Sequence, residues 1–194
     1  MSCFICCLLR EQIQAIPSPV IYLSKMSIKE YKEKRDFSKT QEPKESKSMR
    51  ESKGLLYVIQ RHDASHLHFD LRLEEDDALK SWAIPKLPPQ EAGVKRLAIQ
   101  TEDHPLGYED FEGTIPEGQY GAGKVETWDR GEYFLLEKTS SKRIIEIRGN
   151  KLHGRYCLIK LKAKEQEDKN WLFFKLKEKN VKNIQKKIKR KDTK

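Results

Sequence analysis

The chain has 194 residues and a net charge of +9, with 37% hydrophobic and 36% charged residues, enough for one domain with terminal extensions. No run approaches the ~18 apolar residues that a membrane-spanning helix needs, so we expect no membrane role. Three of the four cysteines (Cys3, Cys6 and Cys7) lie near the N-terminus, and only Cys157 lies in the expected core. A disulfide-linked domain is therefore excluded, and a reducing, cytoplasmic location is favoured.

The N-terminal part of the chain divides into two segments. Residues 1–25 contain a short apolar run without a preceding basic segment, which makes a poor signal peptide. Because Met26 would be a natural start, we interpret residues 1–25 as an extension without function. Residues 26–53 are rich in Lys, Glu, Ser and Arg. We expect them to form a polar arm with a short helix near Ile28–Lys34.

Short strands are expected throughout a folded core at residues 54–177. Between His66 and Leu73 polar and apolar residues alternate strictly, which puts the two sets on opposite faces of a strand. Other runs of β-branched and aromatic residues bounded by turn residues predict further strands. These lie at 55–60, 79–84, 96–100, 124–128, 132–136, 143–147, 156–161 and 171–176.

Turn residues between these runs predict how the strands connect. Asp129-Arg130-Gly131 is expected to join 124–128 to 132–136 as a hairpin, and the segment with Gly149 and Gly154 to join 143–147 to 156–161. The core shows no long helical period. About eight short strands of this kind predict an all-β, mainly antiparallel domain, either a barrel or a sandwich, with short peripheral helices.

The C-terminal tail carries most of the net charge. Between Lys175 and Lys194 there are ten Lys and Arg against Glu178 and Asp192, so the rest of the chain is nearly neutral. We expect residues 178–194 to form a basic tail, with helical spacing near Val181–Ile188. Such a tail either grips nucleic acid or is a solvated extension.

The alternating strand contains the first candidate site. His68 and Asp70 are two residues apart and share a face, and His62 at the end of the preceding strand is placed to join them. Two histidines and one carboxylate are typical of a catalytic metal site with open positions. Arg72 extends this face and could hold an anion. The alternative is a set of solvent-facing polar residues.

A second candidate site is the segment 101–123, which is too rich in Gly, Pro and acidic residues to be a regular strand. A loop of this length in a compact domain is usually functional. His104 could act as a general acid or as a phosphate ligand, or could be a solvent-exposed loop residue. Lys86 and Arg96 are candidate phosphate clamps. His66 and His153 are interpreted as surface or turn residues.

Seven motifs carry a family resemblance. They are YKEKRDF at 31–37, QRHDASHLHFDLRLE at 60–74, KSWAIPK at 80–86, QTEDHPL at 100–106, FEGTIPEG at 111–118, GAG at 121–123 and WDRG at 128–131. In this order they resemble the 3′-phosphoesterase domain of bacterial DNA ligase D over residues 28–177. Because 194 residues cannot also hold polymerase and ligase domains, we expect a standalone form. Leu87 stands where the family pattern has Gly.

The resemblance implies a compact closed β-barrel that binds a divalent metal, above all Mn²⁺, with Zn²⁺ or Co²⁺ as other candidates. The implied metal ligands are His62, His68 and Asp70. The residues implied to serve the scissile phosphate and catalysis are Arg72, His104 and Tyr108, supported at the phosphate by Lys86 and Arg96 and, from an arm that packs on the site, by Arg35, Asp36 and Glu42.

The activity implied is the healing of DNA or RNA 3′ ends. Removal of a terminal ribonucleoside would leave a 3′-phosphate, which is then converted to a 3′-hydroxyl. The implied partners are primer–template ends and a separate ligase, polymerase or Ku-like protein, with the chain itself a monomer. Two other hypotheses are a non-catalytic nucleic-acid-binding module and a metal oxygenase with the same two-His, one-carboxylate set.

Overall fold

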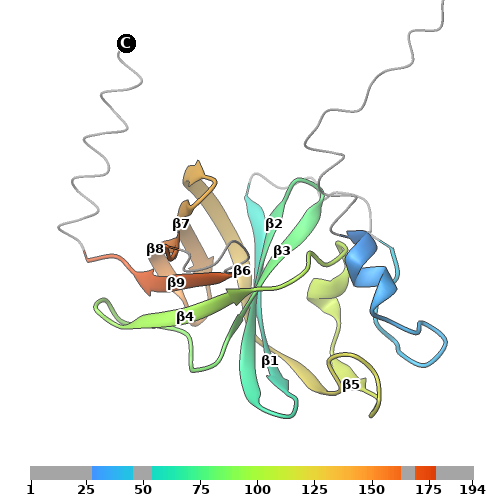
Figure 1. Ribbon diagram of the computed structural model, residues 1–194. Helices are drawn as coiled ribbons and strands as arrows, with labels where there is room; N and C mark the ends of the chain where they lie inside the picture. Colours follow the sequence, from blue (N-terminus) through green and yellow to red (C-terminus); the bar gives the residue numbers. More distant parts are fainter. Residues whose placement is uncertain (1–27, 46–53, 163–168, 178–194) are drawn as a thin grey trace, which may run out of the picture.

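The computed structural model describes residues 28–45, 54–162 and 169–177 (Figure 1). The expected N-terminal extension, the basic tail and the helix expected at 181–188 lie outside these residues. Within the described residues no helix is long and apolar enough to cross a membrane. The arm forms the helix predicted there, at residues 28–33.

Antiparallel strands close into a barrel. Neighbours in the sheet follow the order β1-β2-β3-β4-β9-β8-β7-β6, and pairing of β6 with β1 closes the ring of eight. β5 is added outside the ring, on the start of β6. The strands are β1 (Leu55–Asp63), β2 (Leu67–Glu75), β3 (Ala78–Ile84), β4 (Lys95–Gln100), β5 (Gly113–Ile115), β6 (Gly123–Thr139), β7 (Lys142–Gly149), β8 (His153–Lys160) and β9 (Asn170–Lys175). The prediction of an all-β barrel is confirmed.

The predicted hairpin at residues 129–131 is wrong, because β6 runs without interruption from Gly123 to Thr139. Asp129 and Gly131, the two residues that suggested a turn, make tertiary contacts instead. A side chain at Gly131 would bring its Cβ within 2.2 Å of the Arg148 carbonyl oxygen, so glycine allows β7 to approach. The buried Asp129 carboxylate accepts hydrogen bonds from the backbone N–H groups of residues 150–152. The second predicted hairpin, between β7 and β8, is confirmed.

The inside of the barrel is an apolar core. It includes Phe69, Leu71 and Leu73, the inward-facing set of the alternating strand, together with Trp82 and Trp171, whose rings meet edge to face at 5.9 Å. Leu67, which the same alternation assigns to this face, is 44% exposed because it stands at the start of β2. Burial of such side chains is the main favourable contribution to folding.

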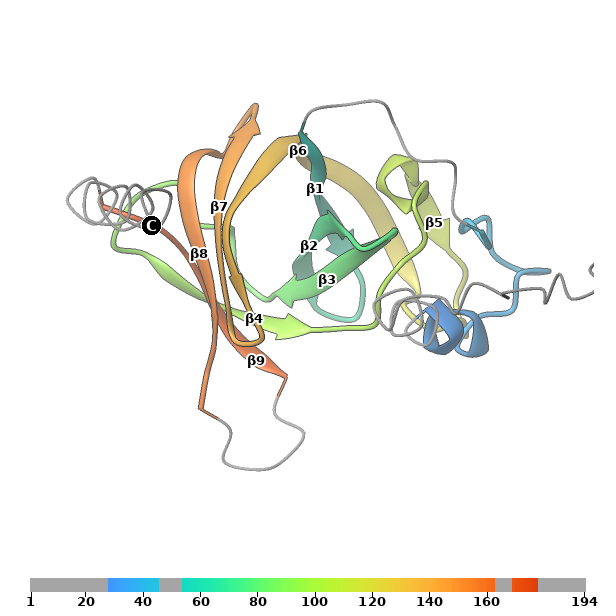
Figure 2. The same cartoon turned by 90° about the horizontal axis from the view of Figure 1, so that it is seen from above.

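A second layer covers the outside of β1, β2 and β3. It consists of the arm, a 3₁₀ turn η1 (Tyr108–Asp110) and the rest of the 101–123 segment, which Figure 2 shows beside the ring of strands. Tyr31 from the arm and Tyr108 from the loop pack there with Leu56, Val58 and Leu79. The outer face of β1 and β2 is therefore buried too, which encloses polar side chains between the barrel wall and this layer.

Candidate metal centre

Three candidate ligands meet on the outer face of the β1–β2 hairpin. His62 and His68 are cross-strand partners in the register, and Asp70 follows His68 on the same face. Asp70 lies 3.5 Å from Nδ1 of His62 through Oδ2 and 3.6 Å from Nε2 of His68 through Oδ1. One ligand atom from each residue lies within 4.8 Å of the others. The hairpin thus gathers the set predicted from the spacing.

Backbone carbonyls determine which nitrogen of each ring is free. Nε2 of His62 lies 2.8 Å from the Gly121 carbonyl oxygen, and Nδ1 of His68 lies 2.9 Å from that of His66. A carbonyl only accepts, so each of these nitrogens donates its N–H. The other nitrogen of each ring, Nδ1 of His62 and Nε2 of His68, points toward Asp70 and is the one that could bind a metal. Such hydrogen bonds orient metal-ligating histidines, and these residues fit a divalent cation.

Arg72 links this cluster to the loop. Its guanidinium donates to Oδ2 of Asp70 at 3.1 Å, to Gln60 at 2.8 Å and to Ser81 at 2.9 Å, and it lies 4.5 Å from the Tyr108 ring centroid. Burial opposes ionisation of Asp70, but Arg72 and the two histidines outweigh it and hold the pKa of Asp70 below its usual value. The carboxylate is therefore charged and available as a ligand.

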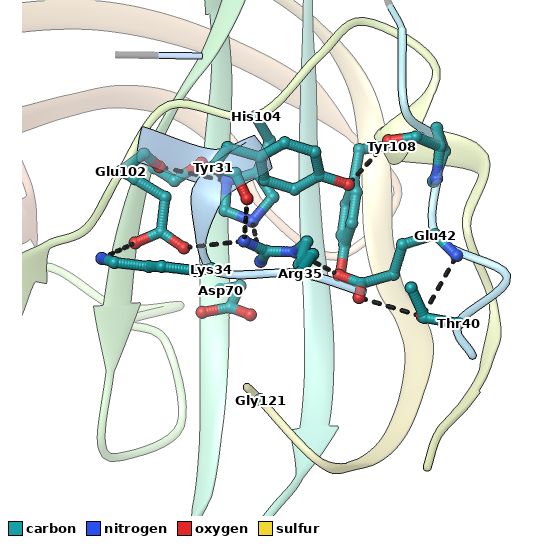
Figure 3. Close-up of polar contacts among 12 residues, drawn as sticks. Tyr31, Lys34, Arg35, Thr40, Glu42, Asp70, Glu102, His104, Tyr108 and Gly121 are labelled. Carbon is teal, nitrogen blue, oxygen red and sulfur yellow. Dashed lines mark hydrogen bonds and ion pairs between the residues drawn. The ribbon is translucent and has the colours of Figure 1, made fainter. Parts of the chain in front are cut away.

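The side chain of Arg35 extends from the arm into the site (Figure 3). It is 4% exposed and lies between two carboxylates, with Nε 2.8 Å from Glu42 and Nη1 3.2 Å from Glu102. Nη2 lies 3.3 Å from Nε2 of His104. Arginine only donates hydrogen bonds, so Nε2 of His104 is the acceptor. The arm thus adds a second buried guanidinium beside that of Arg72.

His104 and Tyr108 pack against each other beside Arg35, with ring centroids 4.6 Å apart. Burial lowers the pKa of His104 well below its usual range, and the charges of Arg72 and Arg35 act in the same direction. Its Nδ1 then donates to the Glu102 carbonyl oxygen at 3.0 Å. Burial raises the pKa of Tyr108, whose hydroxyl donates to Glu42 at 2.9 Å. Both groups are neutral, so the fixed positive charge of the site comes from the two arginines.

These groups surround one cleft of about 300 Å³. Its floor is the β1–β2 hairpin, and the loop and the arm form its sides. The lining residues are Arg35, His62, Ala64, Ser65, His68, Asp70, Arg72, Ala83, Thr101, Glu102, His104, Tyr108, Ile115, Tyr120 and Gly121. Six of the expected site residues outside the arm are therefore in one place, together with Arg35.

Four expected residues do not line the cleft, namely Asp36, Glu42, Lys86 and Arg96. The Asp36 carboxylate is exposed and accepts from the backbone N–H and hydroxyl of Ser38. Arg96 donates to the Leu87 carbonyl oxygen at 2.8 Å, and Lys86 is exposed beyond the end of β3. Neither clamp lines the cleft, and the roles expected of Asp36, Lys86 and Arg96 have no support in the geometry. Glu42 lies behind the cleft, where it holds Arg35 and Tyr108.

Several residues that hold the site together were not predicted from the sequence. Gln60 accepts from Arg72 and donates to the carbonyl oxygens of Tyr108 and Phe111, so it ties the loop to the barrel. Its position two residues before His62 on the same face was the available signal. Glu102 and the Gly121 carbonyl act at places that no pattern marks, because their partners come from distant segments.

The fold and the site together define a β-barrel protein with a two-histidine, one-carboxylate candidate metal centre in an arginine-lined cleft. Comparison with known proteins identifies a family within this class. The family described as DNA Ligase D 3′-phosphoesterase domain matches residues 60–160. The chain belongs to this family.

Curated relatives agree with the match. The chain is 47% identical over 161 residues to the multifunctional non-homologous end joining protein LigD of Pseudomonas aeruginosa, which covers 80% of the chain and 19% of the relative. It is 46% identical over 134 residues to the LigD protein of Mycobacterium bovis (67% and 18%), and 40% identical over 159 residues to that of Mycolicibacterium smegmatis (76% and 20%). The chain spans about a fifth of the length of these relatives.

Proposed function

We propose that this chain is a metal-dependent 3′-phosphoesterase that heals DNA or RNA ends. It would remove a 3′-terminal ribonucleoside and then the 3′-phosphate, leaving a 3′-hydroxyl. One observation carries the proposal. Nδ1 of His62 and Nε2 of His68 face Asp70 at 3.5 and 3.6 Å while backbone carbonyls hold their other nitrogens, and a buried arginine, Arg72, donates to the same carboxylate. The family match supports a phosphate ester as substrate.

His62, His68 and Asp70 would hold the metal, and Mn²⁺, Zn²⁺ or Co²⁺ suits a set of two imidazoles and one carboxylate, with Mn²⁺ our first choice. When bound, such a cation polarises a phosphate oxygen and lowers the pKa of water. Arg72 lies beside these three residues, with Nη2 3.1 Å from Oδ2 of Asp70. It would neutralise a phosphate oxygen there, as fixed cations do in phosphoryl transfer.

Arg35 and His104 would respond to the substrate. Arg35 donates to Nε2 of His104 at 3.3 Å. A phosphate dianion beside them favours the protonated imidazole, because opposite charges raise the pKa of a histidine. His104 would then donate from Nε2 to a phosphate oxygen while Nδ1 stays on the Glu102 carbonyl. Tyr108 would contribute its hydroxyl, which Glu42 holds in place.

The partners follow from this proposal and from the names of the relatives, which describe non-homologous end joining. We infer that the chain acts on primer–template 3′ ends in the cytoplasm, as a monomer, together with a ligase, a polymerase or a Ku-like protein on separate chains. Electrostatic attraction by the basic tail would assist end binding in a salt-dependent way.

A 5′-labelled primer–template with a 3′-terminal ribonucleotide or a 3′-phosphate tests the proposal, with and without Mn²⁺. We expect a 3′-hydroxyl product that requires the metal and that His68→Ala abolishes. The matched control is His66→Ala, because the His66 side chain is exposed and only its backbone contacts His68. Binding of Mn²⁺ by calorimetry should be lost in the first variant and kept in the second.

The same experiment separates the alternatives. Tight oligonucleotide binding without turnover in any metal would favour the non-catalytic module. Turnover in the absence of metal, or product that survives His68→Ala, would contradict the proposed centre. The oxygenase hypothesis predicts oxygen consumption and no release of phosphate. The cleft argues against an oxygenase, since two buried arginines suit an anionic substrate.

A further inference from the structure

Tyr120 lies at the mouth of the cleft. It is 49% exposed, and it is the one aromatic residue among the exposed large hydrophobic residues of the described segments. Among the lining residues only Ser65 and Tyr120 are exposed, whereas Arg72 and Tyr108 at the base are almost fully buried. A strand whose terminal phosphate lies at the base would therefore pass Tyr120 on its way to solvent.

The backbone around Tyr120 is held by the same turn that orients a metal ligand. The Gly121 carbonyl accepts from His62 at 2.8 Å. Two turn hydrogen bonds, from Gln119 N–H to the residue 116 carbonyl and from residue 122 N–H to that of Gln119, close the loop. A Cβ at Gly123 would lie 2.4 Å from the Asp63 carbonyl oxygen, so this loop is pressed onto the end of β1. The ring is thus presented from a fixed position.

Two cations of the arm lie near the Tyr120 ring. Nζ of Lys34 lies 5.0 Å and Cζ of Arg35 lies 5.5 Å from its centroid. These distances are in the range of cation–π attraction. An aromatic ring beside cations is the combination that single-stranded nucleic acid meets in its binding grooves, where bases stack and phosphates are neutralised.

We propose that Tyr120 is a stacking platform for the nucleobase of the 3′-terminal nucleoside, the one that carries the phosphate to be hydrolysed. This inference rests on the proposed function and adds a specificity to it. Stacking requires a base but accepts any base, because every base has a π-face. The site would therefore favour ends with an intact terminal base over abasic ends, without preference for sequence.

The test combines a protein change with a substrate change. The full chain, with Mn²⁺, is given two 3′-phosphate oligonucleotides that differ only in whether the terminal sugar carries a base or is abasic. We compare wild type with Tyr120→Ala, Tyr120→Phe and, as a matched exposed apolar control outside the cleft, Leu87→Ala. Thermal unfolding and Mn²⁺ binding establish that each variant is folded with an intact centre.

Tyr120→Ala should lower kcat/KM on the base-bearing end by about 5- to 100-fold, mostly through KM, which is the range for one stacked base. It should change the abasic end by less than about twofold. Tyr120→Phe and Leu87→Ala should match wild type on both. Equal losses on both ends would instead make Tyr120 a tether of the arm, and no loss on either would overturn the proposal.

Failure of the proposed function gives a different result. Wild type would then release no phosphate from either oligonucleotide, and the comparison moves to binding, measured by fluorescence anisotropy of labelled strands. A loss of affinity in Tyr120→Ala that is confined to the base-bearing strand supports the platform without turnover. Absence of that difference overturns it.

Discussion

The two faces of β2 are both buried, but one is packed with apolar side chains and the other with paired charges. Leu71 faces an apolar core in which shape and volume decide the packing. Asp70 and Arg72, its neighbours in the chain, face a layer in which every buried charge needs a partner. Burying an ion pair costs desolvation that its attraction barely offsets. The inner face therefore stabilises the barrel, while the outer face holds the candidate site together at little gain in stability.

The largest expected effect belongs to the outer face. His68→Ala removes a candidate metal ligand whose side chain is 24% exposed. Mn²⁺ affinity should fall by more than ~100-fold, beyond the range for residues that merely support a ligand. Turnover should fall below detection. The free energy of unfolding without metal should change by less than about 1 kcal/mol. A large loss of stability would contradict the division between the faces.

Leu71→Ala probes the inner face three residues along the same strand. Because Leu71 is fully buried in the core, we expect the free energy of unfolding to fall by about 2–5 kcal/mol. Urea titration followed by tryptophan fluorescence measures it. The molecules that remain folded should bind Mn²⁺ like wild type. Weakened metal binding by folded protein would show that the two faces are coupled.

Glu42→Gln tests the arm. Its carboxylate is fully buried and accepts from Arg35, Thr40 and Tyr108. Loss of its charge leaves Arg35 with less compensation, so we expect a cost of about 1–3 kcal/mol in unfolding free energy and a lower kcat with unchanged Mn²⁺ affinity. Glu45→Gln, an exposed change in the same arm, is the control. Loss of metal binding would contradict a role limited to the arm.

The smallest effect concerns pH. Unfolded His104 takes up a proton as pH falls below about 6.5, whereas burial keeps the native imidazole neutral. The unfolded state then binds more protons, so native stability falls as pH falls, by up to ~1.4 kcal/mol per pH unit. The lowered pKa values of Asp70 and Glu102 cost stability only at more acidic pH.

Comparison of wild type with His104→Gln isolates this contribution. The difference in unfolding free energy, measured without metal between pH 5 and 7 (the range about the usual histidine pKa), should change with pH in the stated direction. Parallel curves for the two proteins would mean that His104 titrates alike in the folded and unfolded chain.

The sequence predicted those parts of the molecule that depend on local pattern. Strict alternation from His66 to Leu73 placed the ligands on one face, and turn residues located most strands. The hairpin at residues 129–131 was wrong because Asp129 and Gly131 are explained by contacts with β7 and the turn after it. A turn-like composition cannot distinguish a loop from a strand whose backbone is closely approached by a neighbouring strand.

The candidate site was predictable to the same extent. His62, His68 and Asp70 followed from cross-strand geometry, since all three lie in one hairpin. Arg72 followed from the same alternation. The other cations did not follow from pattern, because charge alone does not tell which of many Lys and Arg point inward. Lys86 and Arg96 remain outside the cleft. The layer that completes the site depends on tertiary contacts over long separations, such as that of Arg35 with Glu102.

The three candidate ligands come from a single hairpin, whereas Arg35 comes from the arm. The site is therefore built from two separate parts of the chain. The candidate metal ligands belong to a local unit that can assemble as soon as β1 and β2 pair. If the proposed function holds, turnover also requires the arm to dock. We therefore expect that a protein cut between residues 45 and 54 and freed of the arm would bind metal but would not hydrolyse 3′ ends.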